Sequence, residues 1–209
     1  MKCAEFEYDN VPGSRDEIRD RFAPRLRDLV TRRLDNDKEI RDGRTTHAVV
    51  FLGFAPAAHP RYVGNYRGDP LCPCLREYVV GIPSDRRVGY PPSEVHAAMA
   101  EFVVRVGKSV RVLDLAQGVR EPAANKLYTI VVVACRLFEE FLRIHPYANG
   151  NGHMARWLVC ALLARYGHAT KRWTVEPRPP DPPYSVLIAN ARDGDLQSLE
   201  QYVMELLKD

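Results

Sequence analysis

Residues 144–156 read IHPYANGNGHMAR and separate two strongly apolar stretches of the chain. The stretch before them, about 124–144, contains Ile130 to Cys135 (IVVVAC), which is apolar on every side of a helix and is typical of the central helix of a bundle. The stretch after them, about 153–166, has apolar side chains at helical spacing. We therefore predict two buried helices that form the core pair of a mainly α-helical fold, joined by a polar loop.

The regions around this pair predict further helices. Ser14 and Glu17 stand three residues apart in a capping box, and the apolar residues that follow recur at helical spacing over about 15–34. Pro91-Pro92-Ser93 starts another helix with one apolar face, and residues 196–206 form a last amphipathic helix. We find no internal repeat and no long linker, so we expect a single, mostly helical domain.

Two stretches predict strands. Thr46 to Phe54 (THAVVFLGF) is rich in β-branched and aromatic residues, and Glu77 to Ile82 (EYVVGI) is a shorter candidate. Residues 55–75 lie between them and are rich in Pro and Gly, which favours a loop. The β structure that we expect is therefore confined to one part of the chain.

The composition is that of a soluble globular protein. The chain has 209 residues, of which 45% are hydrophobic and 27% are charged, and this length can bury a core without metals or disulfides. The net charge of +3 is too small to predict a nucleic-acid partner. No apolar run approaches the roughly 18 to 20 residues of a membrane span, and the N-terminus lacks the apolar segment of a secretion signal. We expect no membrane partner and a bacterial-type cytoplasmic location, with delivery to another cell left open.

The five cysteines are Cys3, Cys72, Cys74, Cys135 and Cys160. Their number is odd and their positions are scattered, which favours a reducing compartment. Cys135 and Cys160 lie in apolar helical runs, where cysteine is usually a small core residue. The spacing of Cys72 and Cys74 is too tight for a zinc site, and no second cysteine pair completes one.

The loop itself contains the residues that could bind a ligand or catalyse a reaction. Gly150, Asn151 and Gly152 permit positive φ and close backbone approach, and they lead into a helix N-terminus whose free N–H groups favour anions. Arg156 shares a helix face with His153, so its guanidinium can reach back toward the same anion. His145 stands at the other end of the loop, and an unperturbed histidine pKa near 6.5 suits proton abstraction at neutral pH. This combination is what phosphoryl or nucleotidyl transfer requires.

The loop resembles the signature of the Fic (Fic/Doc) family, His-Pro-Phe-x-(Asp/Glu)-Gly-Asn-Gly-Arg-x-x-Arg, which stands here as residues 145–156 (HPYANGNGHMAR). The segment Gly64-Asn65-Tyr66-Arg67, the Pro91-Pro92 helix and the pattern from Pro182 to Leu199 also resemble parts of the family. The resemblance covers about residues 60–207. It implies one Fic-type domain over residues 1–209, with a helical and β extension over about 1–59.

The resemblance also implies an activity, the transfer of a phosphate-containing group, most often AMP from ATP, to a protein hydroxyl. By position, His145 would deprotonate the target Ser, Thr or Tyr. The amides of Gly150 to Gly152, with Asn151, would hold the α- and β-phosphates, and Arg156 would hold the outer phosphates. Tyr147 replaces the Phe that packs the loop onto the core. A β-hairpin flap near residues 77–90 would align the target by strand pairing, and a homodimer is common for this fold.

Two residues depart from the signature. Asn149 stands where the family has the Asp or Glu that coordinates Mg²⁺, and a neutral amide oxygen is a weaker ligand for that cation than a carboxylate. His153 stands where the first Arg is expected, so a permanent charge is replaced by a side chain that is mostly neutral at pH 7. Both departures predict weaker binding of a metal–triphosphate donor through these two residues.

A second motif of the family is an inhibitory helix that blocks the site. Many members carry a Ser/Thr-x-x-x-Glu-Gly/Asn helix whose Glu pairs with the second Arg of the signature. Thr31, Asp35 and Asn36 resemble this motif with Asp in place of Glu. Because Asp is shorter than Glu, a solvated helix end is the competing interpretation.

Three hypotheses about function follow from these residues. The first is a Fic-type transferase that moves a nucleoside monophosphate from ATP and uses His145 as the base. The second is the same fold with another nucleotide or a diphosphate-linked donor, which Asn149 and His153 favour. The third is a catalytically weak binding module that retains the anion site.

Overall fold

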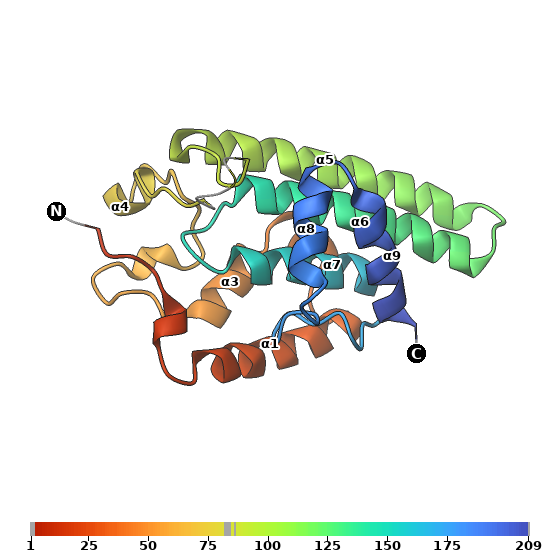
Figure 1. Cartoon of the computed structure of the whole chain (residues 1–209), viewed down its shortest axis with the longest axis horizontal. Helices are drawn as coiled ribbons and strands as arrows, with labels where there is room; N and C mark the ends of the chain where they lie inside the picture. Colours follow the sequence, from red (N-terminus) through yellow and green to blue (C-terminus); the bar gives the residue numbers. More distant parts are fainter. Residues whose placement is uncertain (1–2, 82–84, 86, 209) are drawn as a thin grey trace.

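The computed structural model describes residues 3–81, 85 and 87–208 of the chain, and within them it contains nine α-helices and two short 3₁₀ helices but no strand (Figure 1). The mainly α-helical fold that the sequence predicts is confirmed. The elements in chain order are η1 (Tyr8–Asn10), α1 (Ser14–Val30), α2 (Asn36–Arg41), α3 (Arg44–Phe51), η2 (Pro60–Tyr62), α4 (Pro73–Arg76), α5 (Pro92–Gly118), α6 (Ala123–Ile144), α7 (Asn151–Arg165), α8 (Tyr184–Arg192) and α9 (Leu196–Leu207).

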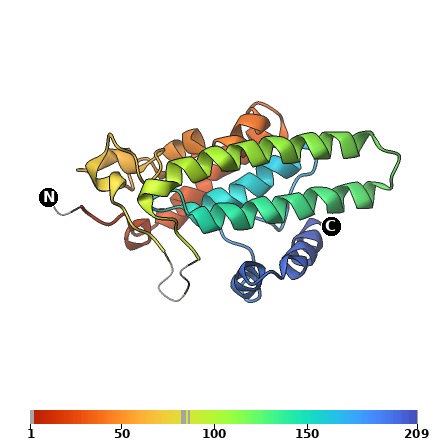
Figure 2. The same cartoon turned by 90° about the horizontal axis from the view of Figure 1, so that it is seen from above.

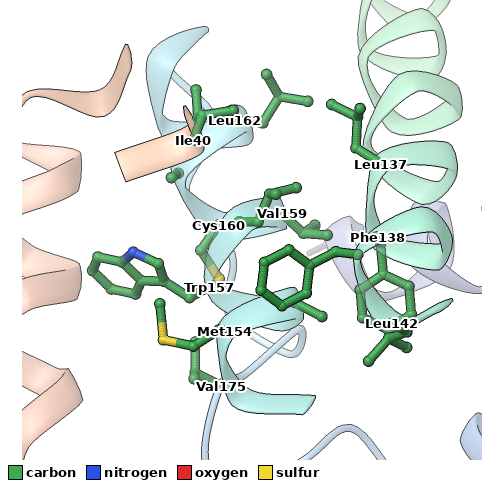
Figure 3. Close-up of a cluster of buried hydrophobic side chains, with 14 of the residues drawn as sticks. Ile40, Leu137, Phe138, Leu142, Met154, Trp157, Val159, Cys160, Leu162 and Val175 are labelled. Carbon is green, nitrogen blue, oxygen red and sulfur yellow. The ribbon is translucent and has the colours of Figure 1, made fainter. Parts of the chain in front are cut away.

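Helices α6 and α7 form the predicted core pair. Phe138 and Leu142 of α6 face Met154 and Val159 of α7 in a cluster of buried apolar side chains (Figure 3). Helices α1 and α2 cover further sides of α7, so nearly all its side chains are buried. This burial on every side explains why the sequence of α7 is apolar without a polar face.

The remaining helices enclose the pair. Figure 2 shows α5 and α6 running side by side along the length of the molecule, joined by a short turn at one end. Helices α8 and α9 pack on α6 from another side. In the part of the chain that the structure describes, no helix is both long enough and apolar enough to cross a membrane.

A buried carboxylate joins the N-terminal helices to α7. Glu39 of α2 is 4% exposed, and its Oε2 accepts hydrogen bonds from Trp157 Nε1 at 2.9 Å and from Thr46 Oγ1 at 2.6 Å. Arg25 of α1 lies 3.4 Å from the other carboxylate oxygen. A buried charge is stable only when it is paired and hydrogen-bonded, so this network fixes α1, α2 and α3 against α7.

The prediction of a strand at Thr46 to Phe54 is wrong, because most of this stretch is helix α3. Its buried residues are Thr46, His47, Val50 and Phe51, a spacing that places them on one face of a helix. The β-branched residues suggested a strand, but β propensity depends on a sheet partner that is absent from the described residues, and packing against α1 and the loop decides the outcome.

The other predicted strand and the flap lie in residues 77–90. Of these, 82–84 and 86 lie outside the described residues, and the described ones contain neither a strand nor the predicted β-hairpin. The segment does fold back on itself: a Cβ added at Gly89 would lie 2.0 Å from Val80 O. Its C-terminal end is held by α6, because Gly89 N donates to Arg143 O and Tyr90 N to Ile144 O.

The first helix is shorter than the sequence predicts. Helix α1 ends at Val30 rather than near residue 34, and Arg32 adopts a left-handed φ of 57° just beyond it. Asp35 then caps α2 by accepting a hydrogen bond from Lys38 N at 3.1 Å. The apolar residues that recur at helical spacing therefore all lie within α1, and the predicted end was about four residues too late.

The cysteines include one disulfide, Cys3–Cys74, which the prediction of a reducing compartment did not anticipate. Cys72, Cys135 and Cys160 are free and buried, as expected for Cys135 and Cys160 in their helices. The bond joins residues 71 positions apart and ties the N-terminal segment to the start of α4. Scattered spacing could not reveal this pair, because it depends on the path of the chain between the two residues.

Candidate functional site

The loop between α6 and α7 is closed by its own side chains. Asn151 Oδ1 accepts a hydrogen bond from Tyr147 N, and Asn151 Nδ2 donates to Tyr147 O, both at 2.8 Å. The Asn151 side chain therefore holds the loop in shape, which leaves its backbone N–H to face a ligand. Tyr147 is 1% exposed and stacks on His47 with ring centroids 3.9 Å apart. It packs the loop onto the core.

Position 150 of this loop accepts only glycine. Its φ is +80°, and a Cβ at this position would lie 2.6 Å from Phe51 Cε2 and 3.2 Å from His47 Nε2. Both the backbone conformation and the close approach of α3 therefore require glycine. The result is that the loop backbone lies directly against α3.

His47 is a residue of this site that sequence reasoning missed. Its Nδ1 accepts from Gly64 N at 2.9 Å, so Nε2 carries the proton and donates to Asn149 O at 3.0 Å. The ring is fully buried, and this burial lowers its pKa to about 4. A neutral His47 of fixed tautomer thus ties α3 to the loop.

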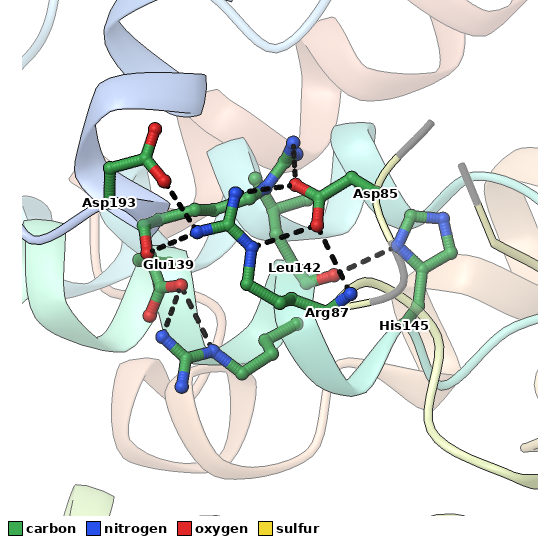
Figure 4. Close-up of polar contacts among 8 residues, drawn as sticks. Asp85, Arg87, Glu139, Leu142, His145 and Asp193 are labelled. Atoms are coloured by element: carbon green, nitrogen blue, oxygen red, sulfur yellow. Dashed lines mark hydrogen bonds and ion pairs between the residues drawn. The ribbon is translucent and has the colours of Figure 1, made fainter. Parts of the chain in front are cut away.

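His145 ends α6 in a left-handed conformation, with φ 55° and ψ 60°. Nδ1 donates to Leu142 O at 2.9 Å (Figure 4), and this bond assigns the proton to Nδ1. Nε2 makes no hydrogen bond with any described residue. Burial, together with the charges of Arg67 and Arg192, lowers the pKa of His145 to about 4. The imidazole is therefore neutral at pH 7, and its Nε2 lone pair can accept a proton.

Arg67 holds His145 in this unusual conformation. Its guanidinium is fully buried and donates to four backbone carbonyls, those of His145, Ile144, Tyr78 and Tyr90, at 2.8 to 3.1 Å. Burial lowers the Arg67 pKa to about 10. One side chain thereby fixes the end of α6 and both ends of the segment 78–90, and only its place in the upstream motif pointed to it.

Charged residues of that segment and of α8 lie beside His145 (Figure 4). Arg87 bridges Asp85 at 2.8 Å and Asp193 at 2.6 Å, while Arg192 Nη1 lies 3.5 Å from Asp85 Oδ2. These pairs tie the described part of segment 77–90 to the end of α8. The segment is thereby kept close to His145.

A cavity of about 280 Å³ opens at the N-terminus of α7, a size near the lower end for small-molecule sites. The helical hydrogen bonds begin with Met154 N donating to Gly150 O, so the amides of the first three α7 residues precede the ladder and are available to an anion. The cavity is lined by Tyr8, Asp9, Arg15, His145, Asn149, Gly150, Asn151, Gly152, His153, Arg156, Glu176 and Arg178.

Arg156 reaches this cavity from the second turn of α7. A Cβ at Gly152 would lie 3.3 Å from Arg156 Nη1, so the absence of a side chain there makes room for the guanidinium. Arg156 Nε donates to Val175 O at 2.8 Å, and Nη1 lies 3.4 Å from the Tyr184 hydroxyl. The structure thus brings together His145, Arg156 and the glycine-containing helix N-terminus that the sequence singled out.

The two departures from the signature are both held by protein contacts. Asn149 Oδ1 accepts from Gly150 N at 2.7 Å, and its Nδ2 donates to Phe6 O at 2.5 Å. His153 Nε2 lies 2.7 Å from Glu176 Oε2, and its Nδ1 lies 3.3 Å from the Tyr8 hydroxyl. The N-terminal segment therefore covers this end of the loop.

These contacts bear on the expected Mg²⁺. The Asn149 oxygen is already used by the loop, and among the described residues no group of three His, Cys, Asp or Glu side chains is placed to hold a metal ion. Such a donor set does not fit a metal held by the protein. We therefore derive no catalytic step through Mg²⁺.

The residues of the possible inhibitory helix lie elsewhere. Thr31 Oγ1 donates to Arg27 O, and Asp35 caps α2. Asp35 and Asn36 line a different surface pocket, beside Arg165. The structure does not bring these three residues to Arg156.

The arrangement of helices and loop agrees with a comparison against protein families. The family model for the Fic/DOC family matches residues 45–163, which is more than half of the chain. The chain belongs to the Fic/DOC family. A search of curated proteins finds no match. The family match begins at residue 45, so it includes α3 with His47 and Phe51.

Membership of the Fic/DOC family implies a Fic-fold transferase. Proteins of this family typically move a nucleotidyl or phosphate group, with a nucleotide as donor and a protein as target. In this Fic/DOC protein, His145, the start of α7 and Arg156 line one cavity. Tyr8 and Glu176 also line the cavity, and no sequence signal marked them because they lie outside the loop.

Proposed function

We propose that this protein transfers a nucleoside monophosphate, AMP from ATP in the family's usual reaction, to a Ser, Thr or Tyr hydroxyl of a target protein. The observation that carries the proposal is the neutral His145, whose Nδ1 is bound to Leu142 O while Nε2 is left without a partner among the described residues. The same cavity contains Arg156 and the free amides of α7.

The proposed step follows from these positions. The target hydroxyl loses its proton to His145 Nε2 as its oxygen attacks the α-phosphorus. A bond forms between that oxygen and phosphorus, and the bond from phosphorus to the bridging oxygen breaks, so the rest of the donor leaves with the electron pair. The free amides of Asn151, Gly152 and His153 and the Arg156 guanidinium stabilise the phosphate charge, while the Gly150 amide is bound to Asn149 Oδ1. His153 adds no charge of its own, since burial outweighs its bond with Glu176 and lowers its pKa.

The segment 77–90 is the proposed place for the target. Val79 is 77% exposed, and the backbone of residues 79–81 lines an open groove that also reaches Ala148 of the loop. An extended target segment that lies in this groove would place its hydroxyl near His145.

The first test is transfer of label from a panel of α-³²P nucleotides to proteins in a cell lysate, measured at several pH values. Because His145 has a pKa of about 4, we expect the rate at pH 5.5 to stay within about twofold of the rate at pH 7.5. An ordinary histidine base with a pKa near 6.5 would lose about tenfold over that range. Such a loss would contradict the environment that we assign to His145.

The weak binding module, the third hypothesis from the sequence, is the candidate that is not an enzyme, and it is favoured by the protein contacts of both departures from the signature. The double variant Asn149→Asp, His153→Arg separates the two. If the protein is already an enzyme, we expect the wild type to transfer label before any change is made. Label transfer by the double variant alone would instead favour the binding module.

A further inference from the structure

The carboxylate of Glu176 lies beside His153, the residue that stands at the position of the first Arg of the signature. Glu176 lies in the connection between α7 and α8, and its side chain is 10% exposed. Oε2 is 2.7 Å from His153 Nε2, and the other ring nitrogen of His153 faces the Tyr8 hydroxyl at 3.3 Å. The imidazole also stacks on Phe22 with 7° between the ring planes. These contacts fix the carboxylate inside the cavity.

The contact with Glu176 places a proton on His153 Nε2, because a carboxylate oxygen accepts and the ring nitrogen must donate. Burial lowers the pKa of His153, so Nδ1 is unprotonated and accepts from the Tyr8 hydroxyl. Burial raises the pKa of Glu176, but its bond with His153 and the charges of Arg156 and Arg15 outweigh burial, so the pKa lies below its usual value. At pH 7 the pair is therefore a neutral imidazole with a carboxylate, and it carries one negative charge.

In the part of the chain that the structure describes, three arginines line the cavity, of which two are paired with carboxylates and one is not. Arg15 pairs with Asp9 at 3.0 Å and Arg178 pairs with Asp181 at 2.9 Å, so both are largely neutralised. Arg156 pairs with no carboxylate among the described residues, and its Nη1 lies against Gly152 at the start of α7. A phosphate chain is thus attracted by the amides and Arg156, and it is repelled where it reaches Glu176.

We propose that Glu176 makes the site selective for a donor whose diphosphate ends in an uncharged, hydroxyl-bearing group rather than in a third phosphate. A nucleoside diphosphate joined to a sugar has this chemistry, and its hydroxyls can donate to the Glu176 carboxylate. The inference rests on the proposed function and names its donor class. In the transfer, the phosphorus–oxygen bond between the two phosphates breaks, the sugar phosphate leaves, and the hydroxyl proton passes to His145.

The test compares ADP-ribose with ATP, which share adenosine diphosphate and differ in ending in a ribose or a phosphate. We expect calorimetry without added metal to show at least tenfold tighter binding of ADP-ribose to the wild type. In Glu176→Gln, which keeps the shape and an acceptor oxygen, this preference should fall to threefold or less. Glu205→Gln changes the charge equally on the exposed face of α9 and should keep the wild-type preference.

Equal or tighter binding of ATP by the wild type would overturn the proposal, as would an unchanged preference in Glu176→Gln. If neither adenosine ligand binds, inorganic pyrophosphate and tripolyphosphate repeat the comparison without a base. Pyrophosphate should then bind more tightly, and only while Glu176 is intact; no binding of either also overturns the proposal. Binding is measured without the transfer step, so a protein with the preference but without transfer would refute the proposed function alone.

Discussion

Replacing His145 by Ala is expected to reduce transfer of labelled nucleotide to protein by at least about 100-fold, which is the lower range for loss of a general base. The reason is that His145 presents an unprotonated Nε2 beside the start of α7, while its other nitrogen is bound to Leu142 O. The remaining charged side chains in the cavity are either arginines, which are no base at pH 7, or paired carboxylates.

The left-handed backbone of His145 calls for a second variant. Alanine at φ 55° is strained by roughly 1 kcal/mol, whereas asparagine tolerates this conformation. His145→Asn should therefore fold like the wild type, as judged by its melting temperature, and should still lose transfer. Transfer by His145→Asn at the wild-type rate would show that the histidine is not the base.

The second large effect is expected at Arg67. Replacing it by Met should lower the free energy of unfolding by about 3 kcal/mol, because four buried carbonyls lose their donor. Part of the loss is offset, since the buried guanidinium has no carboxylate partner among the described residues and its pKa is lowered by that burial. Urea unfolding followed by circular dichroism measures the difference.

Arg61→Met is the matched control for this change. Arg61 is half-exposed and pairs at 2.9 Å with the buried Asp69, which also accepts a hydrogen bond from Leu71 N, so the loss of Arg61 should cost only about 1 kcal/mol. Arg67→Lys keeps the charge but concentrates its donors on one nitrogen, which cannot reach four separate carbonyls. We expect this variant to lose transfer more than stability. Equal stability of the Arg67 and Arg61 variants would refute the role assigned to Arg67.

The central helices could be predicted well from the sequence because most of their residues are apolar, as buried helices require. Helix α7 is apolar on all sides, and its predicted ends lie within two residues of the observed ones. Helix α3 was mistaken for a strand, since Val49, Val50 and Phe51 suit either structure when read alone. What separates the two is packing against parts of the chain that are distant in sequence.

The same limit applies to the site. His145, Gly150 and Arg156 lie within one short segment, so their spacing was informative. His47 contacts Asn149 across 102 residues, and Glu176 meets His153 from a connection that looks like an ordinary Pro-rich loop. The Cys3–Cys74 bond likewise depends on the folded path of the chain. No local pattern records these contacts.

The central claim is that His145 catalyses formation of a phosphate ester on a protein hydroxyl. Mass spectrometry of proteins labelled in a lysate by the wild type, compared with His145→Asn, tests it most directly. We expect fragment ions to place a nucleoside monophosphate on a Ser, Thr or Tyr oxygen with the wild type, and to find no such adduct with the variant. The same adduct formed by His145→Asn, or an adduct on nitrogen or sulfur side chains only, would contradict the claim.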